Sequence, residues 1–253
     1  MTTFKSNLKE VGDLSLFAAR VFKRFFSPPF EYAELIKQSY ILGVKTLPLI
    51  IITGLILGLV LTLQSRPILV DFGAENLLPG MVSVSIIREI GPIITALICA
   101  GKIASGIGAE LGSMRVTEQI DAMEVSGVKP LKFLVVTRVL STTLVVPLLV
   151  VFADAIALLG AYLAIQMHTE LSLNLFINQA FTSLSFTDII PATIKTFFFG
   201  YFIGLIGCFK GYYCDRGTEA VGVAANEAVV AASISIFVIN LLAVQVTDLI
   251  TNL

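Results

Sequence analysis

TLPLIIITGLILGLVLTLQS, at residues 46–65, contains no charged side chain. A helix needs about 20 predominantly apolar residues to cross a hydrocarbon core of roughly 30 Å, and this run is long enough to do so. The run at residues 228–247 is equally long and also uncharged. The chain of 253 residues is 56% hydrophobic and 14% charged, whereas an ordinary soluble protein is about one quarter charged. These properties predict an all-α integral membrane protein.

Three further spans are expected where the apolar runs are interrupted. Residues 139–153 and 196–209 are uncharged but short, so each needs a charged neighbour to complete a crossing. Arg88 and Glu89 divide a third run into two halves that are each too short to span alone, so the helix must contain both charges. The five expected spans are residues 46–65, 80–101, 139–166, 189–209 and 226–247. Nothing remains that would form a soluble domain.

The basic residues predict the orientation of these spans. Residues 1–45 hold seven Lys and Arg, residues 102–138 hold five and residues 209–219 hold two, together 14 of the 17 in the chain. Cytoplasmic loops are enriched in Lys and Arg, so these three segments are expected on the cytoplasmic side. The N-terminus is then cytoplasmic and the C-terminus lies on the outer side.

A cytoplasmic helix is expected before the first span, in DLSLFAARVFKRFFSPPF, residues 13–30. Its apolar side chains fall on one helical stripe and its basic side chains favour the opposite side. The stripe consists of Leu14, Phe17, Val21 and Phe25. Such a helix lies along the membrane surface and is ended here by Pro28 and Pro29. The alternative is that the same stripe packs on the protein itself.

The ionisable residues inside the spans are costly and need partners. Each charge costs on the order of 3 kcal/mol at the bilayer centre. Beyond Arg88 and Glu89, the expected spans contain Asp154 and Lys195. One interpretation is internal pairing, of Arg88 with Asp154 or of Glu89 with Lys195. The other is that the charges line a cavity in which the guanidinium holds a phosphate through paired hydrogen bonds. Another interpretation is that the Lys195 side chain extends to the membrane–water interface on the outer side.

The cytoplasmic segment GKIASGIGAELGSMRVTEQIDAMEVSGVKPLK, residues 101–132, contains a short amphipathic helix. Glu118, Asp121 and Glu124 recur along one side, and Gly127 and Pro130 are expected to end the helix. A helix of this kind docks in a groove of a soluble partner, and the alternative is a solvated connector. AGKI lacks the earlier glycine and the final Ser or Thr of a phosphate loop. Any ATP-driven step is therefore expected in another subunit.

No metal or redox site is expected. Cys99, Cys208 and Cys214 form no CxxC pair, and His168 is the single histidine of the sequence. The chain is therefore expected to bind no metal and no cofactor of its own. Since it also lacks a nucleotide-binding motif, it is expected to be a transport subunit and not an enzyme.

Residues 88–130, REIGPIITALICAGKIASGIGAELGSMRVTEQIDAMEVSGVKP, resemble the MlaE (YrbE) permease family. These are membrane subunits of ABC transporters that move phospholipids or other lipids together with MCE-domain proteins. The resemblance implies a single permease domain over residues 1–253, with membrane-surface N-terminal helices at 1–45, a five-span bundle at 46–247 and a cytoplasmic coupling segment at 104–130. It also implies a homodimer, two cytoplasmic ATPase subunits that use ATP, and an MCE-domain protein on the outer side.

The resemblance also suggests roles for individual residues. It implies that TEQIDAM is a coupling helix seated on the ATPase, with contacts from Glu118, Gln119, Asp121, Ala122, Met123, Glu124 and Gly127. It places Arg88 and Glu89 near the lipid pathway. The candidate pathway residues are then Arg88, Glu89, Asp154, Lys195 and Asn240. Asn240 departs from the family, because members often have an acidic residue at that position.

The function expected from this resemblance is lipid transport between a bacterial inner membrane and an MCE-domain partner, with no role in nucleic-acid binding. Two alternative functions remain open. In an ion-coupled secondary transporter Glu89 or Asp154 would carry protons, although the sequence shows no inverted repeat. In a membrane scaffold the chain would only anchor an ATPase or a lipid-binding complex.

Overall fold

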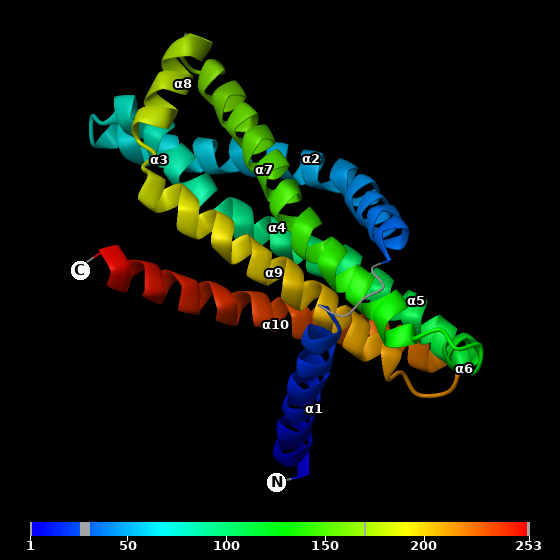
Figure 1. The fold of residues 1–253 in the computed structure, drawn as a ribbon. Helices are drawn as coiled ribbons and strands as arrows, with labels where there is room; N and C mark the ends of the chain where they lie inside the picture. Colours follow the sequence, from blue (N-terminus) through cyan, green and yellow to red (C-terminus); the bar gives the residue numbers. More distant parts are fainter. Residues whose placement is uncertain (1, 26–30, 170, 252–253) are drawn as a thin grey trace. The chain divides into compact units, whose positions relative to one another are not determined.

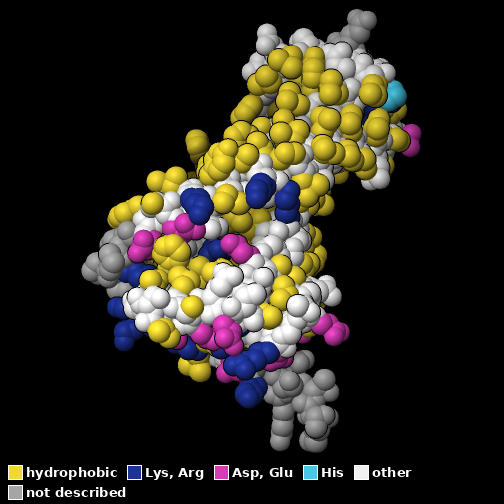
Figure 2. Space-filling model, turned by 90° about the vertical axis from the view of Figure 1, so that its right-hand side faces the viewer, with side chains coloured by type: hydrophobic (Ala, Val, Ile, Leu, Met, Phe, Trp, Pro, Cys, Tyr) yellow, Lys and Arg dark blue, Asp and Glu magenta, His cyan; other side chains and the backbone are white. Residues whose placement is uncertain are grey.

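The computed structural model describes residues 2–25, 31–169 and 171–251, and this part of the chain is helical without a strand. Five of its helices are long and apolar enough to cross a membrane (Figure 1). They cover Tyr32–Asp71, Glu75–Val116, Leu131–Gln166, Phe186–Tyr212 and Thr218–Leu249. The surface in Figure 2 carries broad expanses of hydrophobic side chains, and large apolar residues such as Ile52, Leu148 and Phe237 are more than half exposed. The protein is therefore an all-helical membrane protein, as the sequence predicts.

The elements follow one another along the chain as a series of helices. They are α1 (Thr2–Phe25), α2 (Tyr32–Asp71), η1 (Glu75–Leu77), α3 (Leu78–Ser85), η2 (Ile86–Ile90), α4 (Gly91–Cys99), η3 (Ala100–Ala104), α5 (Ser105–Val116), α6 (Gln119–Val125), η4 (Leu131–Val136), α7 (Thr137–Gln166), α8 (Leu173–Thr182), α9 (Phe186–Tyr212) and α10 (Thr218–Thr251). The segments η2, η3 and η4 are π-helical and η1 is a 3-10 turn.

Most of the long helices extend beyond the expected spans. The first begins at Tyr32 rather than at residue 46, so the expected N-terminal segment 1–45 contains α1 and also the start of α2. Pro28 and Pro29, the expected end of the N-terminal helix, lie outside the described residues. In the segment 104–130, α5 continues the second span and only α6 is a separate helix. α8 was not expected from the sequence.

Contacts divide the chain into two units, and each long helix contributes one end to each of them. The first unit contains Met1–Leu42, Cys99–Val145 and Gly200–Ser235, and the second contains Gly43–Ile98, Val146–Phe199 and Ile236–Leu253. This division into units does not test the expectation of one permease domain, which stays a prediction.

The core of the second unit is built where α2, α3, α7 and α8 meet. Its buried side chains are Leu69, Leu78, Val82, Ile86, Ala157, Ala161, Ile165 and Phe176. Small residues bring α2 and α7 together, because a Cβ on Gly58 would collide with the backbone at Ala157 and one on Gly160 with the Leu55 carbonyl. Without a side chain at these positions the two backbones approach closely, which favours helix association in lipid.

In the first unit, α5 packs closely on α9 and α10. A Cβ on Gly211 would stand 2.8 Å from the Gly108 carbonyl, and one on Gly108 would stand 3.3 Å from the Cα of Ala225. Ala228 and Ala232 of α10 are fully buried. Small side chains therefore allow α5, α9 and α10 to approach closely.

α1 packs part of its apolar stripe on this first unit. Phe17 and Val21 are buried, and the Phe17 ring lies 5.5 Å from that of Phe209 and 5.7 Å from that of Tyr213. Phe22 is 62% exposed and lies outside the stripe. The stripe thus contacts the protein, as the alternative interpretation of the sequence expected.

Candidate functional site

Arg88 and Glu89 lie in η2, the π-helical segment between α3 and α4. The Gly91 N–H donates to the Ile86 carbonyl, five residues earlier, where an α-helix would bond to the residue four earlier. Widened turns of this kind are often found at functional sites. The two charges are therefore presented by a local irregularity of the second span.

Pro92 explains why a lysine approaches this segment. Proline has no N–H, so it does not supply the bond that the Arg88 carbonyl would receive from a residue four positions later. The Lys195 Nζ of α9 donates to that carbonyl at 2.7 Å, and it also lies 3.0 Å from Oε2 of Glu89. The Lys195 side chain is only 4% exposed. Lys195 therefore points into the second unit, and the expected Glu89–Lys195 pair is present.

Glu89 has a second partner in α10. The Asn240 Nδ2 donates to Oε2 of Glu89 at 3.2 Å, whereas Oδ1 of Asn240 has no hydrogen-bond partner in the described part of the chain. An amide at this position thus donates a hydrogen bond to Glu89, which a carboxylate there would not do when ionised. Asn240 thus makes a polar contact with Glu89 without adding a charge.

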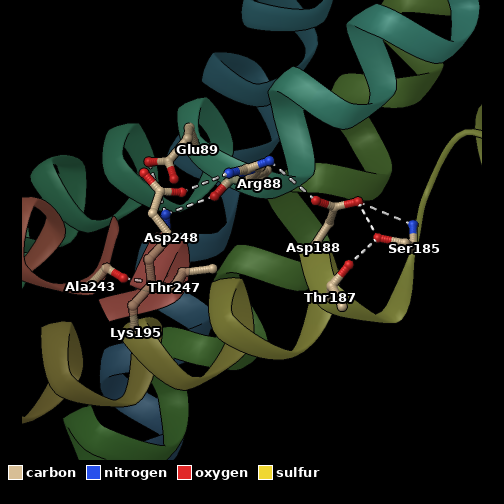
Figure 3. A network of polar contacts seen from close by, with 9 residues as sticks. All are labelled: Arg88, Glu89, Ser185, Thr187, Asp188, Lys195, Ala243, Thr247 and Asp248. Carbon is tan, nitrogen blue, oxygen red and sulfur yellow. Dashed lines mark hydrogen bonds and ion pairs between the residues drawn. The ribbon is translucent and has the colours of Figure 1, made fainter. Parts of the chain in front are cut away.

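Arg88 lies between two carboxylates (Figure 3). Its NH1 is 3.4 Å from Oδ1 of Asp188, at the start of α9, and its NH2 is 3.7 Å from Oδ1 of Asp248, near the end of α10. The Arg88 side chain remains 44% exposed. The pairing of Arg88 with Asp154, considered from the sequence, is not among the ion pairs of the described residues.

Asp188 is held in place by the first turn of α9. The Ser185 N–H donates to Oδ2 of Asp188 at 3.1 Å, and the Ser185 hydroxyl donates to the same oxygen at 2.6 Å. This is the reach of an N3 carboxylate back to the N-cap residue that defines a capping box. The carboxylate that contacts Arg88 is therefore positioned by its own helix terminus.

Asp154 of α7 lies behind the charged segment. Its Oδ1 is buried, has no hydrogen-bond partner among the described residues, and occupies the position at which a Cβ on Gly91 would be built. The glycine that follows Glu89 and Ile90 thus leaves room for this carboxyl group. Of the five predicted pathway residues, Glu89 contacts Lys195 and Asn240 directly, while Arg88 and Asp154 face other neighbours.

A small pocket opens beside these charges within the second unit. Its walls come from η2, the start of α9 and the last turns of α10. The lining residues are Arg88, Glu89, Thr187, Asp188, Pro191, Ala192, Lys195, Ala243, Val244 and Thr247. The pocket therefore combines two cations, two carboxylates and an apolar wall.

The predicted coupling helix is shorter than its amphipathic pattern. α6 begins at Gln119, because Glu118 has φ 58° and ends the preceding helix in the left-handed region. This conformation costs a residue with a Cβ roughly 1 kcal/mol. Gly127 has φ 79°, and the Val128 N–H bonds to the Met123 carbonyl at 3.0 Å, which is the C-terminal closure expected from glycine there.

The predicted ATPase contacts differ in exposure. Glu118, Gln119, Ala122, Glu124 and Gly127 are exposed, and Asp121 and Met123 are half-buried. Asp121 is paired with Arg115 at 2.5 Å, so part of the acidic side is used within the chain. Ile120 is fully buried and anchors α6, whereas Val125 is 90% exposed. Val125 is not on the acidic side that the sequence pattern defined, so its exposure was not predicted.

Asp188 and Asp248 were also missed, for a reason that the helix ends make clear. Both lie one residue beyond the expected spans 189–209 and 226–247, whereas α9 and α10 extend past them. Two signals in the sequence point to these residues. SFTD at residues 185–188 has the spacing of a capping box, and Asp248 follows Asn240 by eight residues, close to two helical turns.

Comparison with known proteins places the chain in a family. The pattern described as Permease MlaE matches residues 35–246. A probable ABC transporter permease protein of Rickettsia prowazekii is 36% identical over 92% of this chain and 90% of its own length. The intermembrane phospholipid transport system permease protein MlaE of Haemophilus influenzae is 35% identical over 81% of this chain and 78% of its own. The chloroplastic protein TRIGALACTOSYLDIACYLGLYCEROL 1 of Arabidopsis thaliana is 28% identical over 88% of this chain and 64% of its own. With a match over most of its length, this chain belongs to the MlaE permease family.

Proposed function

We propose that the chain is the membrane subunit of an ABC transporter that moves phospholipid or a related lipid between the bacterial inner membrane and an MCE-domain protein. The family supports this proposal, and so does the relative from Haemophilus influenzae, which is named for intermembrane phospholipid transport. A separate cytoplasmic ATPase supplies the energy. The permease acts as a homodimer with its N-terminus in the cytoplasm and its C-terminus on the outer side.

The main observation in support of the proposal is that Arg88 is partly exposed and only weakly paired with its two carboxylate neighbours. Its two carboxylate contacts, at 3.4 and 3.7 Å, are longer than the 2.7–2.9 Å typical of a strong charge-assisted hydrogen bond. Its side chain is 44% exposed beside a pocket. The guanidinium therefore has donors to offer to a phosphate, and a phosphate would replace two weak contacts rather than a saturated ion pair.

Glu89 and Lys195, the other ion pair of the pocket, hold the site together without occupying the Arg88 guanidinium. Glu89 is neutralised by Lys195, whose Nζ also holds the backbone of Arg88. Exposed apolar side chains of α10, including Leu241 and Leu242, lie on the helix that forms one wall of the pocket. Acyl chains would follow this apolar surface while the headgroup stays at Arg88.

Energy reaches the permease through α6. Closure of the ATPase subunits pushes on the exposed side of this helix, and covalent continuity passes the movement to α5 and α7. α7 continues as one helix from Thr137 to Gln166 and contains Asp154. Transport follows only if lipid binds the two conformations with different affinities.

The test compares two arginines of the same unit. Arg88→Ala is expected to reduce the phospholipid that copurifies with the permease about tenfold, because a hydrogen bond to a charged group contributes about 1.5–3 kcal/mol. Arg66→Ala is the matched control. Arg66 pairs with Glu75 at 3.0 Å but does not line the pocket. Bound lipid is quantified by mass spectrometry of the purified complex.

The two variants separate lipid binding from folding. Loss of lipid in both would indicate general damage to the permease. Full lipid retention in folded Arg88→Ala would make Arg88 only a structural partner of Asp188 and Asp248, and the proposed headgroup contact would be wrong.

A further inference from the structure

The first unit contains ion pairs that join the segments on either side of α6. NH1 of Arg115, at the end of α5, lies 2.5 Å from Oδ1 of Asp121 in α6. NH2 of Arg138, at the start of α7, lies 2.8 Å from Oε1 of Glu110 in α5. The first pair connects α6 to α5, which precedes it in the chain. The second pair connects α5 to α7, which follows α6.

The Arg138 pair is costly for the fold. The Arg138 side chain is 3% exposed and its Nε has no hydrogen-bond partner in the described part of the chain. A buried donor without a partner is unfavourable, and burying the charged guanidinium is itself costly, whereas its partner Glu110 is 52% exposed. A contribution to stability therefore does not explain why an arginine is buried at this position.

The hydrogen bonds of Arg138 instead indicate a positioning role. NH1 of Arg138 donates to the Leu134 carbonyl at 2.9 Å while NH2 reaches Glu110. The planar guanidinium thus joins the backbone of η4 to a side chain of α5 in one fixed orientation. A lysine has a single nitrogen on a flexible stem and would not fix both contacts in this way.

Covalent continuity through the turns at the two ends of α6 transmits only part of a push on this helix. Glu118 and Gly127 have φ 58° and 79°, so a non-helical turn interrupts the chain at each end of α6. α6 has seven residues, and among them Ile120 is the one buried side chain. Part of a push on so small an element would be absorbed by its turns unless the flanking helices were held together.

We propose that the Arg138–Glu110 and Arg115–Asp121 ion pairs hold α5, α6 and the start of α7 as one rigid lever, so that a push on α6 moves both helices. Arg138, Glu110 and Arg115 are positioning residues in this proposal, which rests on the proposed ATP-driven transport. Without them, ATP hydrolysis continues and less of it results in lipid movement.

The main test is the double variant Glu110→Gln, Arg138→Met, which leaves no charge of the pair behind. The complex with its ATPase and MCE-domain partners is reconstituted in phospholipid vesicles, and ATP hydrolysis and lipid transfer are measured together. We expect hydrolysis to remain within about twofold of the wild type and the lipid moved per ATP to fall about fivefold or more, a usual size for coupling between sites.

A matched ion pair of the same unit provides the control. Nζ of Lys210 lies 2.7 Å from Oε2 of Glu227, with side-chain exposures of 13% and 54% that resemble the 3% and 52% of Arg138 and Glu110. This pair joins α9 to α10, and neither partner belongs to α6. The variant Lys210→Met, Glu227→Gln is expected to move as much lipid per ATP as the wild type.

Arg115→Gln provides a second measurement if the buried double variant fails to fold. The Arg115 side chain is 38% exposed, so its loss disturbs folding little, and Asp121 remains in place. Unchanged lipid per ATP in the folded Arg138 double variant and in Arg115→Gln would overturn the lever. Wild-type vesicles without ATP-dependent lipid transfer would instead overturn the proposed function, and the lever with it.

Discussion

Glu89 is the residue on which the polar contacts of the second unit converge. Lys195 and Asn240 both contact its Oε2, and Lys195 also bonds to the carbonyl of the preceding residue. Three residues of the REIGP motif, residues 88–92, produce this arrangement. Glu89 supplies the acceptor, Gly91 leaves room for Asp154, and Pro92 withholds the N–H that would otherwise compete with Lys195.

The sequence alone led to part of this residue-level picture. The Glu89–Lys195 pair was one of the two internal pairings that the sequence offered, because an unpaired charge in hydrocarbon is costly. The partners of Arg88 were not predicted, because Asp188 and Asp248 lie just beyond the expected spans. Helix ends are set by local capping and solvation, which hydrophobic periodicity does not report.

Gly91→Ala is predicted to destabilise the permease. The added Cβ would stand 2.8 Å from the Ile86 carbonyl, 3.1 Å from Cγ of Asp154 and closer still to its Oδ1. Overpacking of this kind costs about 1–3 kcal/mol. The measurement is the unfolding midpoint of the purified protein in detergent.

Gly101→Ala is the matched control for that substitution. A Cβ on Gly101 meets nothing within 4 Å, so alanine there is expected to be neutral or to stabilise the helix by up to about 1 kcal/mol. Asp154→Ala in the Gly91→Ala background should recover part of the loss. Equal midpoints for the two single alanine variants would show that Gly91 is not tightly packed.

At the scale of elements, α1 shows what hydrophobic periodicity can and cannot decide. The spacing of its apolar residues predicted a helix with one apolar stripe, and that helix is present. The same stripe suits a lipid surface and a protein surface equally well, so the pattern did not choose between them. The π-helical segments η2, η3 and η4 were not foreseen, because an i to i+5 hydrogen bond has no sequence signature comparable to the 3.6-residue period.

Phe17→Ala is predicted to release α1 from the first unit. Phe17 is fully buried against Phe209 and Tyr213, and truncation of a buried phenylalanine costs about 3–5 kcal/mol. The free energy that opposes local opening falls by a similar amount, so trypsin should cleave after Arg20 and Lys23 much faster. Limited proteolysis of the purified permease measures this rate.

Phe22→Ala distinguishes the two interpretations of α1. Phe22 is 62% exposed on the same helix, and exposed substitutions usually change stability by less than about 0.5 kcal/mol. Cleavage in detergent should therefore match the wild type. If Phe22→Ala accelerated cleavage more than Phe17→Ala did, attachment of α1 through the Phe17 stripe would be contradicted.

At the scale of the whole molecule, composition and length were sufficient for the fold class, and the basic residues gave an orientation. Five expected spans correspond to the five long apolar helices. The physical basis is strong, since every backbone polar group must be paired inside the bilayer and a helix does this within one segment. α8 escaped notice because its ten residues are too few to span, and its N-cap, where the Ser172 hydroxyl accepts from the Leu175 N–H, is a short local signal.

The predicted orientation can be tested with a cysteine that the chain already contains. Cys214 lies in the turn between α9 and α10, which is expected on the cytoplasmic side, while Cys99 and Cys208 are fully buried. Burial and the neighbouring Asp215 raise the pKa of the Cys214 thiol. Because the thiolate is the reactive form, labelling by a membrane-impermeant maleimide should continue to accelerate with pH above the pKa of about 8.5 of an ordinary exposed cysteine.

In sealed membrane vesicles of known sidedness, Cys214 is expected to react only when the cytoplasmic face is outward. The control is His168→Cys in a Cys214→Ser background, because His168 is exposed in the turn between α7 and α8 and is expected on the other side. It should react only in vesicles of the opposite sidedness. The two positions lie at opposite ends of a membrane crossing, so labelling of both from one face would contradict five spans, and exchange of the two results would reverse the orientation inferred from the basic residues.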